Sequence, residues 1–240
     1  MSLKWTTRKA LAFVAALIVA GSVVIAVATP SADAATPACS DSSDTCISIF
    51  SRELGTYADP NVVEAVLHGV AKVGQPVILE RASSSDPSED FIPRGGLVSD
   101  FYAAGMVSAE ANSHYGNLNA AQIEYAPYGK ASDLCVGLAA VAFQNEGLTL
   151  QPCTVPATTV TTTVWIIDTA DYPAGYFTIV NGSTTDFRRP FAMTYPRDQQ
   201  AADQRTQQIK LRRLQFLSNE HTVPDRQLWG ALFGVLPTGR

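Results

Sequence analysis

Leu134-Cys135-Val136-Gly137-Leu138 is followed by Gly147-Leu148-Thr149-Leu150-Gln151-Pro152-Cys153 and then by Thr163-Val164-Trp165-Ile166-Ile167. Two short strand-like segments therefore carry one cysteine each, and a tryptophan follows them. In an oxidising compartment, a disulfide between Cys135 and Cys153 would close a hairpin-sized loop and restrict the unfolded chain by roughly 3 kcal/mol. The stretch predicts two neighbouring strands joined by a disulfide.

The order of this stretch recurs twice elsewhere in the chain. Each copy has a strand ending in a cysteine or an apolar residue, a loop, a strand of the form apolar-x-Leu, and a polar stretch that closes on an aromatic residue. The copies run from Cys46 through Val77-Ile78-Leu79 to Phe91, from Cys135 through Leu148-Thr149-Leu150 to Trp165, and from Phe191 through Ile209-Lys210-Leu211 to Trp229. Such repetition is itself a signal of a repeated fold. Many short strands separated by turn residues favour a sandwich or a barrel.

The three copies resemble the repeats of ricin B-type β-trefoils, which end in a Gln-x-Trp motif. Gln227-Leu228-Trp229 matches that motif, Thr163-Val164-Trp165 keeps the tryptophan, and Glu89-Asp90-Phe91 keeps an aromatic residue. The Cys-Val-Gly-Leu and Leu-Gln-Pro-Cys arrangement is also similar to that of exported actinobacterial proteins. The resemblance implies an all-β fold, a β-trefoil over residues 45–238, with pseudo-equivalent repeats at about 45–105, 122–182 and 187–236. It also implies that Phe91, Trp165 and Trp229 pack together in a common core.

The N-terminus has the order of a secretory signal peptide. Lys4, Arg8 and Lys9 precede an apolar run over residues 10–28, and Ala32 and Ala34 supply an Ala-x-Ala site. We therefore expect residues 1–34 to be a signal peptide cleaved after Ala34, residues 35–44 to be a flexible leader, and the protein to be secreted without further contact with a membrane. The alternative is a retained membrane anchor through residues 10–28, because that run is long enough to span a bilayer.

Charge, cysteine and histidine content indicate which partners, disulfides and metal sites to expect. The formal net charge is −5, and the cationic residues are scattered apart from Lys210, Arg212 and Arg213, so nucleic acid is not an expected partner. Four cysteines in an exported chain predict disulfides, and the preferred pairing is Cys39 with Cys46 and Cys135 with Cys153. The three histidines, His68, His114 and His221, match no metal motif, so neither a metal nor a cofactor is expected.

The sugar-binding residues of the ricin B-type family are replaced in this chain. The family places an Asp two positions after the first cysteine, where Ser48, Gly137 and the Met193 region stand here, and an aromatic residue where Gln151 stands. Arg226 replaces the Asn that precedes the Gln-x-Trp glutamine. Galactose-type binding through the usual pockets is therefore not expected, since a sugar needs both directional acceptors and an apolar platform. The remaining candidate ligand contacts are Tyr125, Tyr128 and Gln227.

No common catalytic motif is present. The chain lacks a Gly-x-Ser-x-Gly elbow, a His-Glu-x-x-His motif and a phosphate-binding glycine loop. A hydrolase would have to use carboxylates such as Glu53, Glu64, Glu80, Asp168 and Asp171. The sequence favours a secreted, non-catalytic binding module for a glycan or a cell-envelope polysaccharide. The alternative is a secreted protein-interaction or structural protein, such as an inhibitor or a surface component, with an uncharacterised hydrolase as the third possibility.

Overall fold

The computed structural model describes residues 46–233, apart from residues 84, 155–159, 170–171, 174, 198–206 and 218–222. The described chain forms twelve strands. They are β1 (Ile47–Ser51), β2 (Val62–Val66), β3 (Val77–Arg81), β4 (Phe91–Leu97), β5 (Asn119–Tyr125), β6 (Leu134–Gly137), β7 (Thr149–Pro152), β8 (Trp165–Asp168), β9 (Thr178–Asn181), β10 (Phe191–Thr194), β11 (Lys210–Arg213) and β12 (Trp229–Phe233). The helical segments are α1 (Val98–Ala103), α2 (Ala109–Tyr115) and the 3-10 turns η1 (Leu67–Gly69), η2 (Pro87–Glu89), η3 (Pro127–Gly129) and η5 (Asp225–Gln227).

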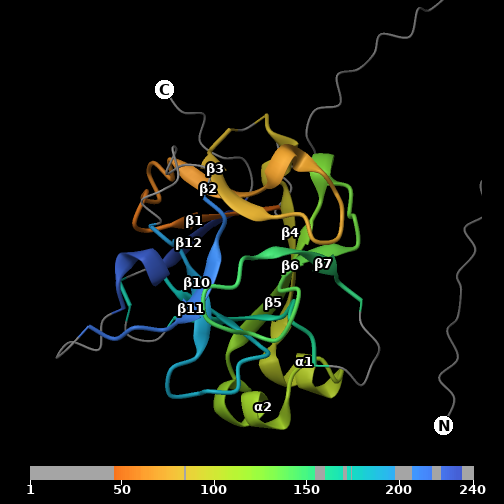
Figure 1. Cartoon of the computed structure of the whole chain (residues 1–240), viewed down its shortest axis with the longest axis vertical. Coiled ribbons are helices and arrows are strands. Elements are labelled where there is room, and N and C mark those ends of the chain that lie inside the picture. The colour runs from red at the N-terminus through yellow and green to blue at the C-terminus, as the bar shows by residue number, and fades with distance from the viewer. Residues whose placement is uncertain are drawn as a thin grey trace, which may run out of the picture. The chain divides into compact units, whose positions relative to one another are not determined.

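Six of the strands close into a barrel (Figure 1). Strand β1 pairs with β12 and with β4, β4 pairs with β5, β5 with β8, and β8 with β9. The ring closes where Phe177 and Trp229 exchange two backbone hydrogen bonds of 3.0 and 2.9 Å, which join the β9 and β12 segments. Closure removes the exposed edges that an open sheet would present.

The other six strands form three hairpins, β2 with β3, β6 with β7 and β10 with β11. Backbone hydrogen bonds link these hairpins in a cycle. The amide of Val77 donates to the carbonyl of Leu148 (2.9 Å), that of Leu148 to Ile209 (2.9 Å), and that of Ile209 to Val77 (3.0 Å). A six-stranded barrel with three cyclically bonded hairpins is a β-trefoil, so the predicted fold is confirmed. Its lobes are β1–β4 (lobe 1), β5–β8 (lobe 2) and β9–β12 (lobe 3).

The strand register corrects how the sequence copies were aligned. In each lobe the second strand is bridged to the first at one position, which pairs Val63 with Phe50, Cys135 with Glu124 and Ala192 with Val180. Val63, not Cys46, therefore corresponds to Cys135, since Cys46 lies before β1. Strand β9 opens lobe 3, so the predicted repeat boundary between residues 182 and 187 falls after the first strand of lobe 3. Lobe 2 begins with β5 at residue 119 rather than at 122.

The aromatic residue that ends each sequence copy occupies the same station in each lobe. Phe91, Trp165 and Trp229 are each fully buried in one apolar cluster, as predicted. The indole Nε1 of Trp165 donates to the carbonyl of Val136 (2.8 Å), and that of Trp229 donates to the carbonyl of Met193 (3.0 Å). Each tryptophan thus ties its hairpin to the barrel with a buried hydrogen bond, while Phe91 contributes apolar packing alone.

Helices α1 and α2 form the long insertion between lobes 1 and 2, whose helical structure the sequence patterns did not predict. They lie together at the end of the barrel opposite the β2–β3 hairpin (Figure 1). Ser108 caps α2 by accepting a hydrogen bond from the amide of Ala111 (3.0 Å). Ala111 and Val98 join a second apolar cluster with residues on β5, β8 and β9. This packing stabilises the two helices, because helices this short are only marginally stable in isolation.

The predictions for the N-terminus concern residues outside the described part of the chain. The predicted signal peptide, the leader and Cys39 all lie before residue 46, whereas Cys46 is disulfide-bonded. Within the described residues, no helix is both long enough and apolar enough to cross a membrane.

The core of lobe 1 contains a carboxylic acid. Glu64 pairs with Leu79 in the β2–β3 hairpin, as Val136 pairs with Leu150 in lobe 2 and Met193 with Leu211 in lobe 3. Its side chain is fully buried, and neither oxygen has a hydrogen-bond partner. Burial raises the pKa of Glu64 from 4.5 to about 8.

We predict that Glu64→Met stabilises the protein and flattens its pH profile. A buried polar group without a partner costs about 1–3 kcal/mol, and methionine is the side chain that lobe 3 already uses at this station. Because the folded pKa is raised, the folded state binds the extra proton between pH 4.5 and 8, so stability falls as the pH rises across that window. The slope from one such group is at most about 1.4 kcal/mol per pH unit.

The check is the free energy of unfolding in urea at pH 5, 6, 7 and 8. The exposed Glu110 supplies the control variant, Glu110→Gln, which should keep the wild-type profile. Some slope should remain in Glu64→Met, because burial also raises the pKa of Glu89 to about 8. A Glu64→Met protein with the same pH slope as the wild type would contradict the prediction.

Candidate functional site

A pocket in lobe 1 gathers polar and aromatic side chains from four segments. It has a volume of about 480 Å³. Its polar lining includes His68 on η1, Glu80 on β3, Asp86 and Ser88 at η2, and Tyr128 on η3. We call it the lobe-1 pocket. The first four residues belong to lobe 1, whereas Tyr128 reaches it from the β5–β6 connection of lobe 2.

Carboxylates give the lobe-1 pocket an acidic character. Asp86 caps η2, where its Oδ1 accepts a hydrogen bond from the amide of Ser88 (2.9 Å). Burial raises the pKa of Glu80, the neighbouring Asp86 raises it further, and His68 lowers it. Below the pocket, both oxygens of the buried Glu89 accept from the amide of Ser83 (3.0 Å each). The pocket therefore offers hydrogen-bond acceptors beside an imidazole.

Two residues of the lobe-1 pocket have left-handed backbone. His68 has φ 58° and Tyr128 has φ 57°, and each is followed by a glycine that is also left-handed. Non-glycine residues in this region carry strain that the surrounding structure must hold. At Tyr128 the restraint is visible, because its amide donates to Oδ2 of Asp90 (2.9 Å). Strained residues gather at functional sites, and here two of them border one pocket.

The three predicted ligand contacts have different environments. Tyr128 is 55% exposed and lines the lobe-1 pocket. Tyr125 is fully buried, and its hydroxyl donates to the carbonyl of Gly69 (2.9 Å), so it supports the pocket wall from behind. Gln227 is also buried, and its amide nitrogen donates to Oγ1 of Thr194 (2.9 Å) and to the carbonyl of Arg213 (3.1 Å). Structural roles account for Tyr125 and Gln227, and no ligand contact is proposed for either.

The corrected register moves two positions of the family's sugar-binding pattern. The positions two residues after Val63, Cys135 and Ala192 are Ala65, Gly137 and Thr194, so Ser48 and Met193 are not the relevant residues. None of the three has a carboxylate. The position of the family's stacking aromatic residue, Gln151 in lobe 2, corresponds to Glu80 in lobe 1 and Arg212 in lobe 3. The usual sugar contacts are thus absent from these positions in every lobe.

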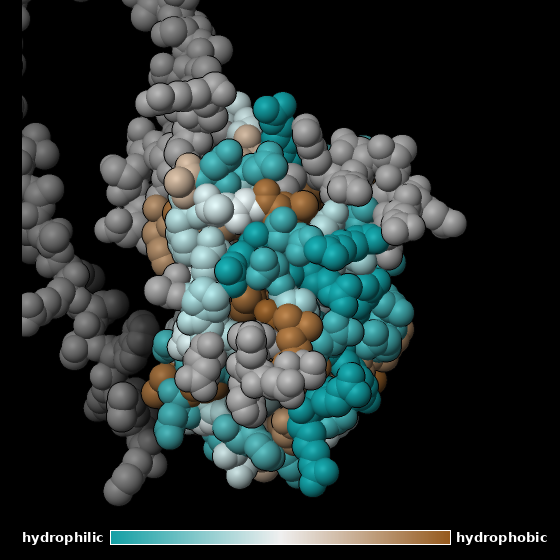
Figure 2. Space-filling view, turned by 90° about the vertical axis from the view of Figure 1, so that its left-hand side faces the viewer, coloured by the Kyte–Doolittle hydropathy of each residue, from teal (hydrophilic) through white to brown (hydrophobic). Residues whose placement is uncertain are grey.

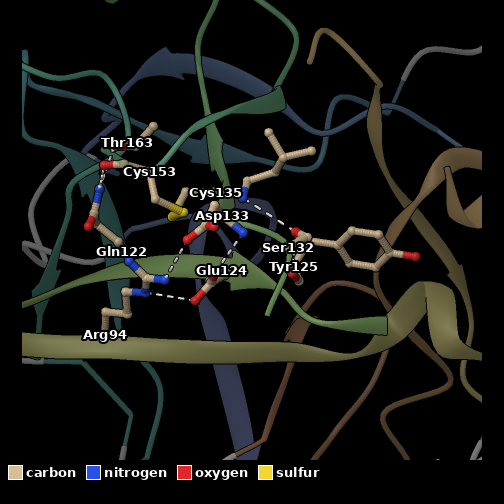
Figure 3. Close-up of polar contacts among 10 residues, drawn as sticks. Arg94, Gln122, Glu124, Tyr125, Ser132, Asp133, Cys135, Cys153 and Thr163 are labelled. Atoms are coloured by element: carbon tan, nitrogen blue, oxygen red, sulfur yellow. Dashed lines mark hydrogen bonds and ion pairs between the residues drawn. A yellow bond between two sulfur atoms is a disulfide. The ribbon is translucent and has the colours of Figure 1, made fainter. Parts of the chain in front are cut away.

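Lobe 2 uses its polar side chains to hold strands together (Figure 3). The carboxylate of Glu124 accepts from Nε of Arg94 (2.7 Å) and from the amide of Asp133 (2.8 Å). The amide nitrogen of Gln122 donates to the carbonyl of Cys153 and to Oγ1 of Thr163, both at 2.8 Å. These bonds connect β5 to its neighbours on both sides.

The predicted disulfide between Cys135 and Cys153 is confirmed, and it joins β6 to the end of β7. Both cysteines are buried, and Gln122 bonds the backbone at the second one. The disulfide therefore belongs to the structural network of lobe 2 and is remote from solvent.

The carboxylates considered for hydrolysis are not gathered in one cleft. Glu64 lies in the core, Glu80 lines the lobe-1 pocket, and Glu53 forms an ion pair with Arg197. Asp168 ends β8, and Asp171 lies outside the described residues. Nor does any described part of the chain bring three His, Cys, Asp or Glu side chains together in a metal-binding arrangement.

Comparison with family models gives no match, and neither does comparison with curated protein sequences. Solved structures with a similar course of the chain include the designed threefold-symmetric protein ThreeFoil, at 10% identity and TM-score 0.48, covering 78% of this chain and 97% of that one. They also include 1,3Gal43A, an exo-beta-1,3-galactanase from Clostridium thermocellum (10% identity, TM-score 0.49, 80% and 31% covered), and Cry35Ab1 (10%, 0.43, 82% and 38%). At these values the trefoil assignment rests on the strand pairing described above.

We predict that a Cys135→Ser, Cys153→Ser double variant loses about 2–4 kcal/mol of stability, because the closed loop restricts the unfolded chain. Thermal unfolding by circular dichroism measures the loss, and wild-type protein under reducing conditions should melt at a similar temperature. Ligand binding measured well below the melting temperature should be unchanged, since neither cysteine lines the lobe-1 pocket. Unchanged unfolding would contradict the structural role of the bond.

Proposed function

We propose that the protein is a secreted, non-catalytic binding module of β-trefoil form that recognises a glycan, such as a cell-envelope polysaccharide, through the lobe-1 pocket. The observation that carries this proposal is that an exposed tyrosine ring, Tyr128, and the acceptors Glu80 and Asp86 line one pocket. A sugar ring presents an apolar face and a rim of hydroxyl groups. A ring platform and carboxylate acceptors match those two features.

The ricin B-type resemblance supports a sugar ligand but suggests different contacts. Gln227-Leu228-Trp229 keeps the family motif, and both its outer residues serve the core. The platform in lobe 1 comes instead from the neighbouring lobe, since Glu80 stands at the family's stacking position. In this proposal, Tyr128 replaces the aromatic residue with which each repeat of the family contacts its sugar.

The composition of one face of the molecule favours a polar ligand. On the face shown in Figure 2, hydrophilic side chains surround small, separate groups of hydrophobic ones. A large continuous apolar patch on a surface marks a protein-binding or membrane-binding site. This supports the glycan ligand over the alternative of a protein-interaction scaffold, for which a stoichiometric protein partner would be expected.

We predict that Tyr128→Ala weakens glycan binding by roughly thirtyfold, which corresponds to about 2 kcal/mol for a ring truncated in a binding pocket. The measurement is a glycan array that includes envelope polysaccharides, followed by calorimetry with the best ligand, using residues 35–240. Tyr102→Ala is the matched control, because Tyr102 is 43% exposed on α1 and does not line the pocket.

Two results would overturn the proposal. One is an array without binding in any glycan class. The other is equal binding by the Tyr128→Ala and Tyr102→Ala variants, which would place the ligand elsewhere. The Glu80→Gln variant tests separately whether the carboxylate contributes to glycan binding, since it keeps the shape of the side chain and removes its charge.

A further inference from the structure

A second pocket, lined mainly by residues of lobe 3, has a different chemistry. It has a volume of about 600 Å³, and its lining includes Arg52, Glu53, Tyr172, Arg197 and Arg226. We call it the lobe-3 pocket. Its lining carries three arginines and two carboxylates, Glu53 and Asp225, in a chain whose formal net charge is −5.

Some residues that line the lobe-3 pocket stand at positions equivalent to residues of the lobe-1 pocket but differ from them in charge. By strand register and by distance from the core aromatic residue, His68 corresponds to Arg197 and Ser88 to Arg226, and both arginines line the lobe-3 pocket. The counterpart of Glu80 is Arg212, which does not line it. The backbone is conserved in detail, since Arg197 has φ 52° and His68 has φ 58°. The segments η2 and η5 also form the same 3-10 turn before the core aromatic residue. At these shared positions, an imidazole and a hydroxyl in lobe 1 are thus replaced by two guanidinium groups in lobe 3.

The arginines differ in how their charge is balanced. Arg52 forms an ion pair with Asp225 (3.3 Å), and Arg197 forms one with Glu53. Arg226 donates instead to Oε1 of Gln215, a neutral amide. Burial lowers the pKa of Arg226, and the positive charges of Arg212 and Arg197 lower it further. A half-buried cation beside other cations gains most from an added anion.

We propose that the lobe-3 pocket binds an oxyanion, the carboxylate, sulfate or phosphate group of an acidic ligand, with Arg226 as the main contact. A guanidinium presents a planar fork of donors that matches the paired oxygens of these groups. The ring of Tyr172 and the side chain of Leu217 line the same cavity and offer apolar contact to the part of the ligand that carries the charge. This site is separate from the lobe-1 pocket and does not depend on the glycan proposed there.

The test measures binding of inorganic sulfate and of a galacturonic acid trisaccharide to residues 35–240 at constant ionic strength, by calorimetry. Arg226→Gln should weaken both by about tenfold, because one charge-assisted hydrogen-bonding group is lost. Arg188→Gln, which removes the same charge from an exposed residue outside the pocket, should bind as the wild type does. Arg226→Lys keeps the charge without the fork and should be intermediate.

The two probes separate the sources of the anion. A trisaccharide that binds much more tightly than sulfate assigns the site to an acidic polysaccharide, whereas equal affinities assign it to a simple oxyanion. Tyr128→Ala should leave both affinities unchanged, so failure of glycan binding in lobe 1 would not affect this result. The proposal is overturned if neither probe binds saturably, or if Arg226→Gln and Arg188→Gln weaken binding equally. Thermal melts of the variants confirm that each is folded.

Discussion

The cycle of backbone hydrogen bonds among Val77, Leu148 and Ile209 holds the three lobes in one structure. Each hairpin donates to the next and accepts from the previous one, so no lobe can satisfy its own hairpin edge. The cycle repeats nearby, where the amides of Leu79 and Leu150 donate to Gln207 and Gln75. A buried backbone group without a partner is costly, so removing one lobe would leave donors and acceptors open in the other two. The stability of the fold is therefore collective.

Because this cycle uses only backbone atoms, it leaves the side chains of the pockets free to differ. The residues that pair across the hairpins at one station are Glu80, Gln151 and Arg212, an acid, an amide and a base on equivalent backbone. Threefold symmetry constrains the core residues more tightly, since each must fill the same space beside the same neighbours. Trp165 and Trp229 even keep the same hydrogen bond to a hairpin carbonyl. The lobes can therefore share a fold and bind chemically different ligands.

The sequence predicted the core better than the pockets. The apolar-x-Leu segments and the aromatic residues Phe91, Trp165 and Trp229 were identified because packing and hydrogen bonding restrict the residue type there. The first strands were harder to place, since Cys46 resembled Cys135 without sharing its register. Tyr125 and Tyr128 lie three residues apart, yet one is fully buried and the other is exposed, since β5 ends between them. The residue types alone do not show where a strand ends, and so they do not predict which of the two tyrosines is buried.

The pockets depend on left-handed loop residues, which the hydrophobic periodicity of the sequence does not predict. His68 and Arg197 both have left-handed φ, five residues after the position at which the second strand of each lobe is bridged to the first. Lobe 1 also keeps Glu64 unpartnered in its core, where lobes 2 and 3 have apolar residues. Natural proteins break local rules of packing and backbone geometry most often near functional sites. Strained backbone and buried acids thus coincide in lobe 1, beside the pocket with the exposed tyrosine. In lobe 2, by contrast, the disulfide and the hydrogen bonds of Glu124 join neighbouring strands, so these groups have a structural role.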